Sequence, residues 1–291
     1  MNAIDETCKV CGSATEPVGV VTGRLRGRTF HVRRCGTCGY GFIADPWTDY
    51  GEIYSDAYYA GEGADPLVDY VFEMEHVDRT IRRYEWRGIA ARVHALTPVG
   101  AATRWLDYGC GTGGLVTYLR GRGVDAVGFE QGWSVPRLRE REVPIVDELD
   151  EHAGRYDVVT AIEVLEHVLD PVEELRRMAA LLRPGGLLFL TTGNAEPHRE
   201  KLNEWNYVIP EIHVSFFEPR TLVTAMERAG LRPERPGFGP GWTDIIRFKA
   251  LKNLKRRTVS PLDRALPWPV LARALDRRIH TSAHPVGWAP R

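Results

Sequence analysis

The pattern of hydrophobic and polar positions is most regular in the middle of the chain, between residues 103 and 231. There, apolar runs of strand length alternate with segments whose apolar residues recur every three or four positions, the spacing of an amphipathic helix. Strands that alternate with helices form a mostly parallel sheet that is covered on both faces. The expected strands are 105–106, 126–129, 144–146, 156–162 and 187–191, and the expected helices are 115–119, 171–182 and 221–229.

The segments on either side follow other patterns. Residues 66–96 repeat apolar positions at helical spacing and predict two helical stretches before the first strand. Beyond the central region, the pattern predicts a basic helix at 244–257, one or two short helices at 261–279 and a final edge strand at 284–289. The first 44 residues carry β-type residues between two pairs of cysteines, which predicts a ribbon of short strands.

A glycine-rich turn follows the first expected strand of the central region. Four glycines stand within the six residues from Gly109 to Gly114, and the expected helix begins directly after them. Glycine allows positive φ and lets a ligand touch the main chain, and a helix N-terminus offers unpaired N–H groups. Glu130 ends the next strand about 20 residues further on, where an acid grips the hydroxyl groups of a ribose. The combination predicts a nucleoside-cofactor pocket at the carboxyl end of the sheet.

The glycines alone leave the cofactor open, because Gly109, Gly111 and Gly114 also fit the dinucleotide pattern of a nicotinamide oxidoreductase. Two further features narrow the choice. Asp107 stands two residues before the first glycine, where it can reach an ammonium group. The strand at 156–162 leads into an acidic segment and then a helix that ends in Arg-Pro-Gly-Gly. This order of elements resembles the class I S-adenosylmethionine (SAM)-dependent methyltransferases.

That resemblance implies SAM as the methyl donor. Asp107 and the glycine loop would hold the methionine end, and Glu130 would take the ribose hydroxyls. Asp147 would lie near the adenine, although it also fits a solvated acid in an acidic run. The full set of implied cofactor contacts is Asp107, Gly109, Gly111, Gly113, Glu130, Gln131, Asp147 and Glu163.

The predicted fold class is therefore α/β, a doubly wound, mostly parallel sheet of the Rossmann-like methyltransferase kind with a small N-terminal zinc ribbon. We expect four regions along the chain. They are a zinc ribbon at 1–44, an aromatic connector and helical cover at 45–100, a SAM-binding core at 101–244, and a basic C-terminal extension at 245–291 that completes or covers the core.

The cysteines predict the metal of the ribbon. They form two Cys-x-x-Cys-Gly knuckles with 23 residues between them. Each knuckle can point two thiolates at one ion, and two knuckles complete a tetrahedron, so Cys8, Cys11, Cys35 and Cys38 predict a structural zinc site. Two disulfides or a redox pair are the alternatives, and a reducing compartment disfavours the disulfides. Cys110, alone in the glycine turn, is interpreted as a packing residue.

Charge is unevenly distributed along the chain. The net charge is −1, but residues 245–291 carry 11 Lys and Arg against two acids, which leaves −10 on the first 244 residues. A basic C-terminal region suits binding to an anionic substrate, a nucleic acid or a membrane surface. The alternative is that it is a solvated helix face whose charge offsets that of the acidic remainder of the chain. No apolar run approaches the ~20 residues of a membrane span, and the acidic start does not resemble a signal peptide, so we expect a cytoplasmic protein.

Candidate acceptor-side residues follow one of the central strands. Glu163, Glu166 and His167 are spaced at i, i+3 and i+4, and they share one face if a helix begins there. His213, in a later loop, is interpreted as a general base or an acceptor-orienting group, since a pKa of about 6.5 suits it to take a proton at neutral pH. A packed loop histidine beside two phenylalanines is the alternative.

Glu-x-x-Glu-His with a later His resembles the metal-binding quartet of small-RNA 3′-end 2′-O-methyltransferases, and it is similar to the ubiquinone-pathway O-methyltransferases. In those families a divalent ion activates the acceptor oxygen. The resemblance implies that Glu163, Glu166, His167 and His213 can hold such a cation. Many small-molecule methyltransferases carry the motif without a metal. The alternative that the Glu-His pair only orients the methionine end of SAM therefore stays open.

The front of the chain carries a second resemblance. A four-cysteine ribbon, a tyrosine-rich connector and a SAM fold, in this order, are similar to sugar C-methyltransferases that act on nucleotide-linked ketosugars. The resemblance implies that Tyr54, Tyr58 and Tyr59 face the donor or the acceptor, and the alternative is that they pack the ribbon against the core. Trp205 and Tyr207 are candidates for a lid over the site, and for them too the alternative is a packing role. The later loop reads Glu-Ile-His where that family has Glu-His.

We therefore expect a SAM-dependent methyltransferase whose acceptor is a small molecule, with an anionic molecule, a sugar or a natural-product intermediate as candidates. One alternative is an RNA methyltransferase, because the basic tail and the ribbon arginines suit nucleic acid. The segment after Ile162 lacks the Asn-Pro-Pro-Tyr type of turn, which argues against methylation of exocyclic base amines. A SAM-fold protein that binds partners without catalysis is the other alternative. The arginines in question are Arg24, Arg26, Arg28, Arg33 and Arg34.

Overall fold

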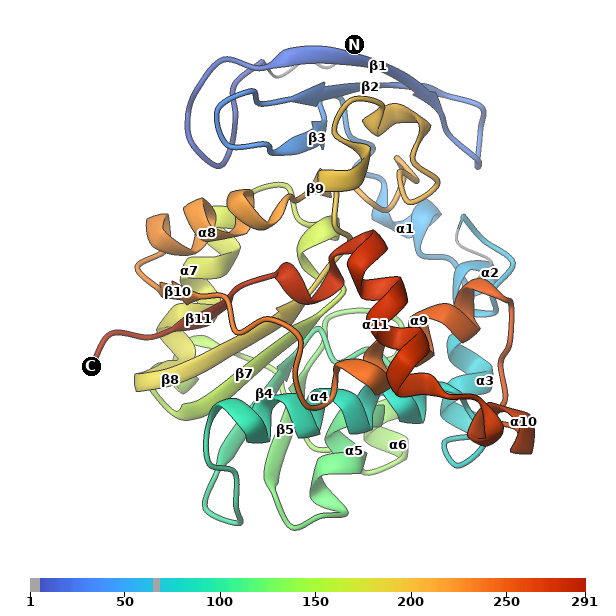
Figure 1. The fold of residues 1–291 in the computed structure, drawn as a ribbon, viewed down its shortest axis with the longest axis vertical. Coiled ribbons are helices and arrows are strands. Elements are labelled where there is room, and N and C mark those ends of the chain that lie inside the picture. The colour runs from blue at the N-terminus through green and yellow to red at the C-terminus, as the bar shows by residue number, and fades with distance from the viewer. Residues whose placement is uncertain (1–5, 65–68) are drawn as a thin grey trace.

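The computed structural model describes residues 6–64 and 69–291 (Figure 1). The expected helical stretch at 66–96 begins outside the described residues, as does the acidic start of the chain. In the described part, no helix has the length and the apolar character that crossing a bilayer requires.

A seven-stranded sheet forms the centre of the molecule, in the order β10-β11-β8-β7-β4-β5-β6 (Figure 1). The strands from β4 to β8 pair in parallel, whereas β11 pairs antiparallel with both β8 and β10. The mostly parallel sheet predicted from the sequence is confirmed. The strands are β4 (Arg104–Tyr108), β5 (Asp125–Phe129), β6 (Ile145–Val146), β7 (Tyr156–Ile162), β8 (Leu182–Thr191), β10 (Arg232–Glu234) and β11 (Val286–Trp288).

The last strand corrects one expectation. The sequence pattern predicts an edge strand at 284–289, but β11 lies inside the sheet, between β8 and β10. Gly287 pairs with Leu188 on one side and with Pro233 on the other. A short apolar segment has the same pattern at the edge of a sheet and in its interior, because only its long-range partners differ. The C-terminal end of the chain therefore completes the sheet.

Helices cover both faces of the sheet. On one face, α4, α5, α6 and α9 bury apolar side chains such as Trp86, Leu119 and Ile245 against Trp105 of the sheet, and α11 packs outside α9. The other face is covered by α7 and α8. These helices are α4 (Arg82–Leu96), α5 (Gly114–Arg120), α6 (Val135–Glu140), α7 (Pro171–Leu181), α8 (Pro219–Arg228), α9 (Trp242–Asn253) and α11 (Trp268–Ile279), and the short ones are α1 (Tyr50–Ile53), α2 (Asp56–Tyr59), α3 (Tyr70–Glu75) and α10 (Pro261–Ala265).

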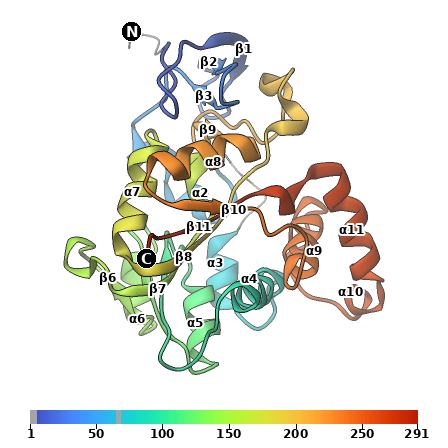
Figure 2. The ribbon, with the colours of Figure 1, turned by 60° about the vertical axis from the view of Figure 1, so that its left-hand side comes forward.

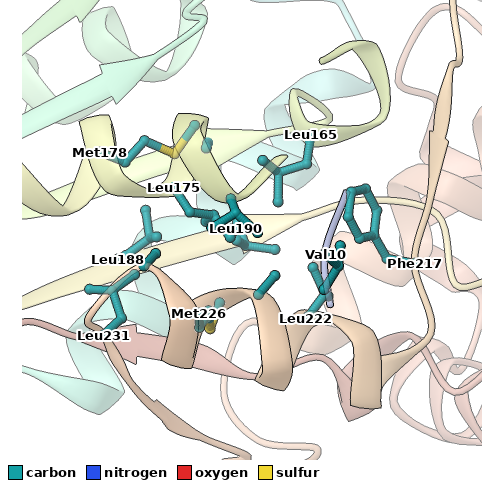
Figure 3. Close-up of a cluster of buried hydrophobic side chains, with 14 of the residues drawn as sticks. Val10, Leu165, Leu175, Met178, Leu188, Leu190, Phe217, Leu222, Met226 and Leu231 are labelled. Atoms are coloured by element: carbon teal, nitrogen blue, oxygen red, sulfur yellow. The ribbon is translucent and has the colours of Figure 1, made fainter. Parts of the chain in front are cut away.

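The second face of the sheet is where the ribbon joins the core. Figure 3 shows Leu175 from α7 and Met226 from α8 meeting Leu188 of β8, with Val10 of the ribbon pointing into the same cluster. α7 begins where Asp170 accepts a hydrogen bond from the Glu173 N–H at 3.1 Å, a side-chain cap of the kind that starts helices.

The ribbon has a four-stranded sheet of its own, in the order β1-β2-β3-β9 (Figure 1). Three of these strands come from the N-terminal region, as the sequence predicts, and β9 comes from the loop before α8. All the pairs are antiparallel. The strands are β1 (Glu16–Thr22), β2 (Thr29–Arg34), β3 (Gly41–Ile43) and β9 (Ser215–Phe216).

Contacts around β9 fix residues 207–218, which we call the acceptor loop, to the ribbon. The Ile43 N–H donates to the Val214 carbonyl at 3.0 Å. The Leu25 N–H donates to the Glu211 carboxylate at 2.9 Å. The hydroxyl groups of Tyr40 and Ser215 share a hydrogen bond of 2.6 Å. The loop that carries His213 therefore depends on the ribbon for its position.

Candidate functional site

A cavity of about 1210 Å³ opens at the carboxyl ends of the central strands. Ligands of open α/β sheets bind at this edge. The cavity has a donor wall beside the glycine loop and an acceptor wall beside the segment after β7. The structure brings together most of the predicted site residues, and those lining the cavity are Tyr58, Tyr59, Asp107, Gly109, Gly111, Glu130, Gln131, Glu163, Glu166, His167 and His213.

Two predicted cofactor contacts lie elsewhere. Asp147 is exposed, and its carboxylate accepts a hydrogen bond from Arg139 at 2.5 Å, which favours the alternative of a solvated acid. Gly113 has a φ of 70° and precedes α5, and a Cβ placed on it would meet Leu138 at 2.7 Å. This glycine is therefore required by the turn and by packing, and neither residue is among the described residues that line the cavity.

The donor wall contains a buried carboxylate. Asp107 lies in β4, and its Oδ1 accepts a hydrogen bond from the Thr160 hydroxyl at 2.8 Å. Burial raises the pKa of Asp107 to about 7, against the opposing effect of that hydrogen bond. A buried carboxylate that faces a cavity is stabilised by a cationic partner. The position therefore suits the ammonium group of an amino-acid moiety.

Glu130, at the end of β5, is held by backbone donors. Its two carboxylate oxygens accept hydrogen bonds from the N–H groups of Gly111, Gln131 and Gly132 at 2.9 to 3.0 Å. Gly111 has a φ of 54°, and the space where its Cβ would stand is open. The glycine turn thus orients the carboxylate and keeps the main chain accessible to a ligand.

The tyrosine-rich connector closes the donor wall. The ring of Tyr59 stacks on Trp133, with centroids 4.4 Å apart and planes 8° apart. The indole N–H of Trp133 donates to Asp56 at 2.7 Å, which ties α2 to the segment after Glu130. Sequence reasoning named Tyr59 but missed Trp133, because the stack is formed between segments far apart in the chain.

The segment after β7 corrects a second expectation. The spacing of Glu163, Glu166 and His167 predicts one helical face, but Leu165–His167 form a single 3₁₀ turn and no α-helix begins there. Glu163 has a φ of 55°, a left-handed conformation that a helix cannot continue through. The three side chains therefore do not share one helical face, although Glu163 and Glu166 both accept hydrogen bonds from the Tyr207 hydroxyl, at 3.3 Å and 2.5 Å.

Glu163 and Glu166 differ in charge although they are neighbours. Glu163 accepts hydrogen bonds from Lys249 and from Thr191, each at 2.9 Å. Burial alone would raise its pKa, but the ammonium groups of Lys249 and Lys252 lower the pKa of Glu163 below its usual value. Burial, and then the charge of Glu163, raise the pKa of Glu166 to about 8. Glu166 therefore takes up a proton more readily than Glu163 does.

Tyr207 connects this pair to the acceptor loop. Its hydroxyl donates to Glu166 at 2.5 Å, and Thr192 donates to the other carboxylate oxygen at 2.8 Å. The ring of Tyr207 lies against the ring of His213, with centroids 4.2 Å apart. Tyr207 thus holds Glu166 and His213 in one cluster.

Both histidines of the acceptor wall have a defined tautomer. The Nδ1–H of His213 donates to the Tyr207 carbonyl at 2.7 Å, and the Nδ1–H of His167 donates to the Ile212 carbonyl at 2.8 Å. In each neutral ring Nε2 is then the nitrogen with the lone pair. Burial lowers the pKa of His213 to about 3, which corrects the value near 6.5 assumed from the sequence. His213 is a neutral acceptor of hydrogen bonds at physiological pH.

Two groups of side chains among the described residues could hold a metal ion. Cys8, Cys11, Cys35 and Cys38 have their sulfurs within 4.8 Å of one another. Zn–S bonds of about 2.3 Å in a tetrahedron place the sulfurs roughly 3.8 Å apart, close to the 3.5 Å between Cys8 and Cys38. All the described cysteines are free thiols, so the disulfide alternative is not what the structure shows.

The second group is smaller than the predicted quartet. Glu166, His167 and His213 have ligand atoms within 4.8 Å of one another, but Glu163 is not in this group. Glu163 is engaged by Lys249 instead. The structure thus brings together three of the four predicted ligands.

The ribbon arginines are engaged within the protein. Arg24 donates to the Ala64 carbonyl at 2.6 Å, and Arg26 pairs with Glu52 at 2.6 Å. The other three make contacts of the same kind. Arg28 binds the Asp45 carbonyl, Arg33 binds Thr15, and Arg34 binds Glu218. Four of these contacts join the ribbon to residues beyond it, and the contact to Thr15 lies within it, so the arginines have partners inside the protein.

Sequence reasoning missed two lysines of the acceptor wall. Lys249 and Lys252 belong to the basic C-terminal region, and both line the cavity from α9. Lys252 has no hydrogen-bond or ion-pair partner among residues 6–64 and 69–291. The i, i+3 spacing puts the two lysines on one helix face. The packing of α9 on α4 decides that this face meets the cavity.

The sequence profile of the Methyltransferase domain family matches residues 78–235. A ubiquinone biosynthesis O-methyltransferase of Marinobacter nauticus is 40% identical over 111 residues, which are 33% of this chain and 47% of that protein. The enzyme of the same name from Bordetella avium is 34% identical over 150 residues, 45% of this chain and 62% of that protein. The chain thus spans about half the length of the curated relatives it matches.

Solved structures show more distant likenesses. In a complex of the Haloferax volcanii Trm112 methyltransferase activator and a putative methyltransferase, one chain is 18% identical at a TM-score of 0.49, with 72% of this chain and 92% of that chain covered. A putative sarcosine dimethylglycine methyltransferase from Galdieria sulphuraria is 18% identical at a TM-score of 0.42, with coverage of 71% and 83%.

Proposed function

Because the chain belongs to the methyltransferase domain family and is a class I SAM-dependent methyltransferase, we propose that it methylates a small molecule held in the acceptor half of its cavity. One observation carries this proposal. A single cavity joins the carboxylates Asp107 and Glu130 to the cluster of Glu166, His167 and His213. Donor and acceptor can therefore meet in a space that the connector covers.

The donor wall fits SAM residue by residue. Asp107 pairs with the ammonium group, and its pKa of about 7 falls when that cation arrives. Glu130, already oriented by three backbone N–H groups, accepts hydrogen bonds from the ribose hydroxyls. Tyr59 and Trp133 close this end. When bound, SAM supplies a sulfonium-activated methyl group.

His213 receives the acceptor. Its Nε2 lone pair accepts a hydrogen bond from the acceptor's hydroxyl group. Burial makes this imidazole a weak base, but the hydroxyl proton becomes strongly acidic as the methyl group reaches the oxygen, so Nε2 can take it during transfer. Tyr207 and Glu166 hold the imidazole in place, and Tyr58 covers the site from the connector. Catalysis here consists of orienting the acceptor, excluding water and accepting one proton.

The acceptor carries a negative charge. Lys249 is neutralised by Glu163, so Lys252 supplies the unmatched positive charge on this wall. An anionic group on the acceptor balances it at small desolvation cost. A phosphorylated sugar and an anionic natural-product intermediate are the acceptors to screen first.

Two metal sites enter this proposal differently. Zinc, bound by the four ribbon cysteines, is structural, because four thiolates leave no open position. A divalent cation at Glu166, His167 and His213 is a further candidate, with the acceptor supplying another ligand. Dialysis against a chelator that leaves the ribbon zinc in place tests the second site. Activity should be lost if a divalent cation at Glu166, His167 and His213 takes part in catalysis, and it should be retained if the ribbon zinc is the only metal used.

Isothermal titration tests the donor half. The full chain should bind SAM and S-adenosylhomocysteine but not NAD, and Glu130→Gln should weaken SAM binding. Transfer of a labelled methyl group from SAM into a panel of anionic hydroxylated molecules tests the acceptor half. SAM binding without turnover of any acceptor would support a non-catalytic binding protein instead, and binding of NAD in place of SAM would contradict the proposal.

A further inference from the structure

The exposed apolar side chains of the described residues are concentrated in one region. Six of the nine large hydrophobic side chains that are exposed in residues 6–64 and 69–291 lie between Leu254 and Ile279. Leu262 and Val270 are 73% and 68% exposed. Single exposed leucines are common, but a cluster of them marks a surface that binds something. We call Leu262, Leu266, Val270 and Leu271 the C-terminal apolar patch.

This patch lies on the outside of the molecule. Figure 2 shows α10 and α11 as the outermost layer on their side, with α9 between α11 and α4. Trp268 and Ala272 form the buried side of α11, so Val270, which is two residues from each, points away from the core. The patch therefore belongs to the outer helices of the molecule.

Basic side chains flank the patch along the chain. Val270, Arg273 and Arg277 stand at i, i+3 and i+7, on one exposed face of α11. The two acids of this region are turned inward: Asp263 is buried, and Asp276 accepts a hydrogen bond from the Ser282 N–H at 2.7 Å. The other exposed cations of the region are Lys255, Arg256 and Arg278, whereas Arg257 pairs with Asp69 at 2.7 Å.

We propose that the C-terminal apolar patch binds the surface of an anionic lipid bilayer. Its aliphatic side chains enter the boundary between headgroups and acyl chains, and the arginines of α11 pair with lipid phosphates. Such a helix lies in the plane of the interface. The inference concerns where the enzyme works and is independent of which acceptor it methylates.

The observations favour a bilayer over a protein partner. A two-fold symmetric contact between copies would place the arginines of both α11 helices in or around one interface, where the like charges would repel. The buried centres of protein interfaces are enriched in aromatic side chains, whereas this patch is aliphatic. A deformable bilayer also accommodates an outer helix without a complementary groove.

Binding through the patch would bring the cavity close to the headgroups. Lys252 and Asn253, at the end of α9, and Ile279, at the end of α11, line the cavity. The helix α11, which carries Val270 and Leu271 of the patch, thus also contributes Ile279 to the cavity wall.

Co-sedimentation with vesicles tests the proposal on the full chain. The protein should bind vesicles of equal parts phosphatidylglycerol and phosphatidylcholine, and high salt should weaken this binding by screening the arginines. It should bind pure phosphatidylcholine vesicles much less. Arg273→Gln/Arg277→Gln should weaken binding about 30-fold. Leu262→Ser/Val270→Ser should weaken it about tenfold or more.

A matched control changes exposed apolar residues elsewhere. Val20→Ser/Leu169→Ser, at positions 53% and 42% exposed, should bind vesicles like the wild type. Unchanged SAM binding in each variant shows that it is folded. No binding of the wild type to anionic vesicles, or equal binding by Leu262→Ser/Val270→Ser, would overturn the proposal. A dimer that this variant abolishes, with no vesicle binding, would assign the patch to contacts between copies and would also overturn it.

Discussion

Removal of the ribbon metal should disable the acceptor half of the cavity and leave the donor half intact. The reason is the attachment of the acceptor loop to the ribbon. Three of the hydrogen bonds that join the two run from Ile43 to Val214, between Tyr40 and Ser215, and from Leu25 to Glu211. The pairing of β3 with β9 and the contact of Arg34 with Glu218 add to them, so an estimate from the three bonds is a lower bound. The donor carboxylates are held instead by Thr160 and by the glycine turn.

The size of the effect follows from these contacts. A hydrogen bond contributes about 0.5–1.5 kcal/mol net, so three contribute roughly 1.5–4.5 kcal/mol to holding the acceptor loop. At about 1.4 kcal/mol per factor of ten, their loss raises the population of the released loop by roughly tenfold to a thousandfold. Turnover should fall by a comparable factor, because His213 is then seldom in place, whereas SAM affinity should change less than about twofold.

Cys35→Ser provides the perturbation, and Thr37→Ser, at an exposed position of the same knuckle outside the quartet, is the matched control. Isothermal titration measures SAM binding, and hydrogen exchange measures release of the loop. The Val214 N–H, which donates to the Glu166 carbonyl at 2.7 Å, should exchange faster in Cys35→Ser only. Normal protection of this N–H in the zinc-free protein would refute the reasoning. Loss of SAM binding in parallel with turnover would refute it as well.

The remaining predictions concern single residues of the cavity. SAM affinity should be about tenfold weaker at pH 6 than at pH 8, because Asp107, with a pKa of about 7, must lose its proton to bind the ammonium group. Asp107→Asn should remove this pH dependence of SAM affinity. Glu130→Ala should weaken SAM binding by about 1.5–3 kcal/mol in a titration, and Asp147→Ala should leave it unchanged. His213→Ala should keep SAM binding and reduce turnover ~10²–10⁴-fold in a labelled-methyl assay; normal turnover would make it a packing residue.

The sequence predicts those features that depend on local order. Gly111 and Glu130 are recognisable because a tight turn needs glycine and because strand ends repeat at a fixed interval in a parallel sheet. The knuckles of the ribbon are recognisable because two cysteines three residues apart can reach one ion. These features need no knowledge of distant partners.

The features that the sequence does not predict depend on distant contacts or on a single backbone angle. Ser215 joins the ribbon sheet through a strand of only two residues, paired with a segment more than 170 residues away. Lys252 faces the cavity only because α9 packs on α4. Glu163 adopts a φ of 55°, and the i, i+3, i+4 spacing of the acids contains no sign of it. Burial also changes the chemistry of His213 in a way that residue identity does not reveal.

The most direct test of the central claim is a crystal structure of the full chain with S-adenosylhomocysteine. The account predicts that Asp107 contacts the amino group, that Glu130 accepts hydrogen bonds from both ribose hydroxyls, and that the sulfur faces the cluster of Glu166, His167 and His213 across the same cavity. A ligand bound outside this cavity, or one whose sulfur faces away from His213, would contradict it.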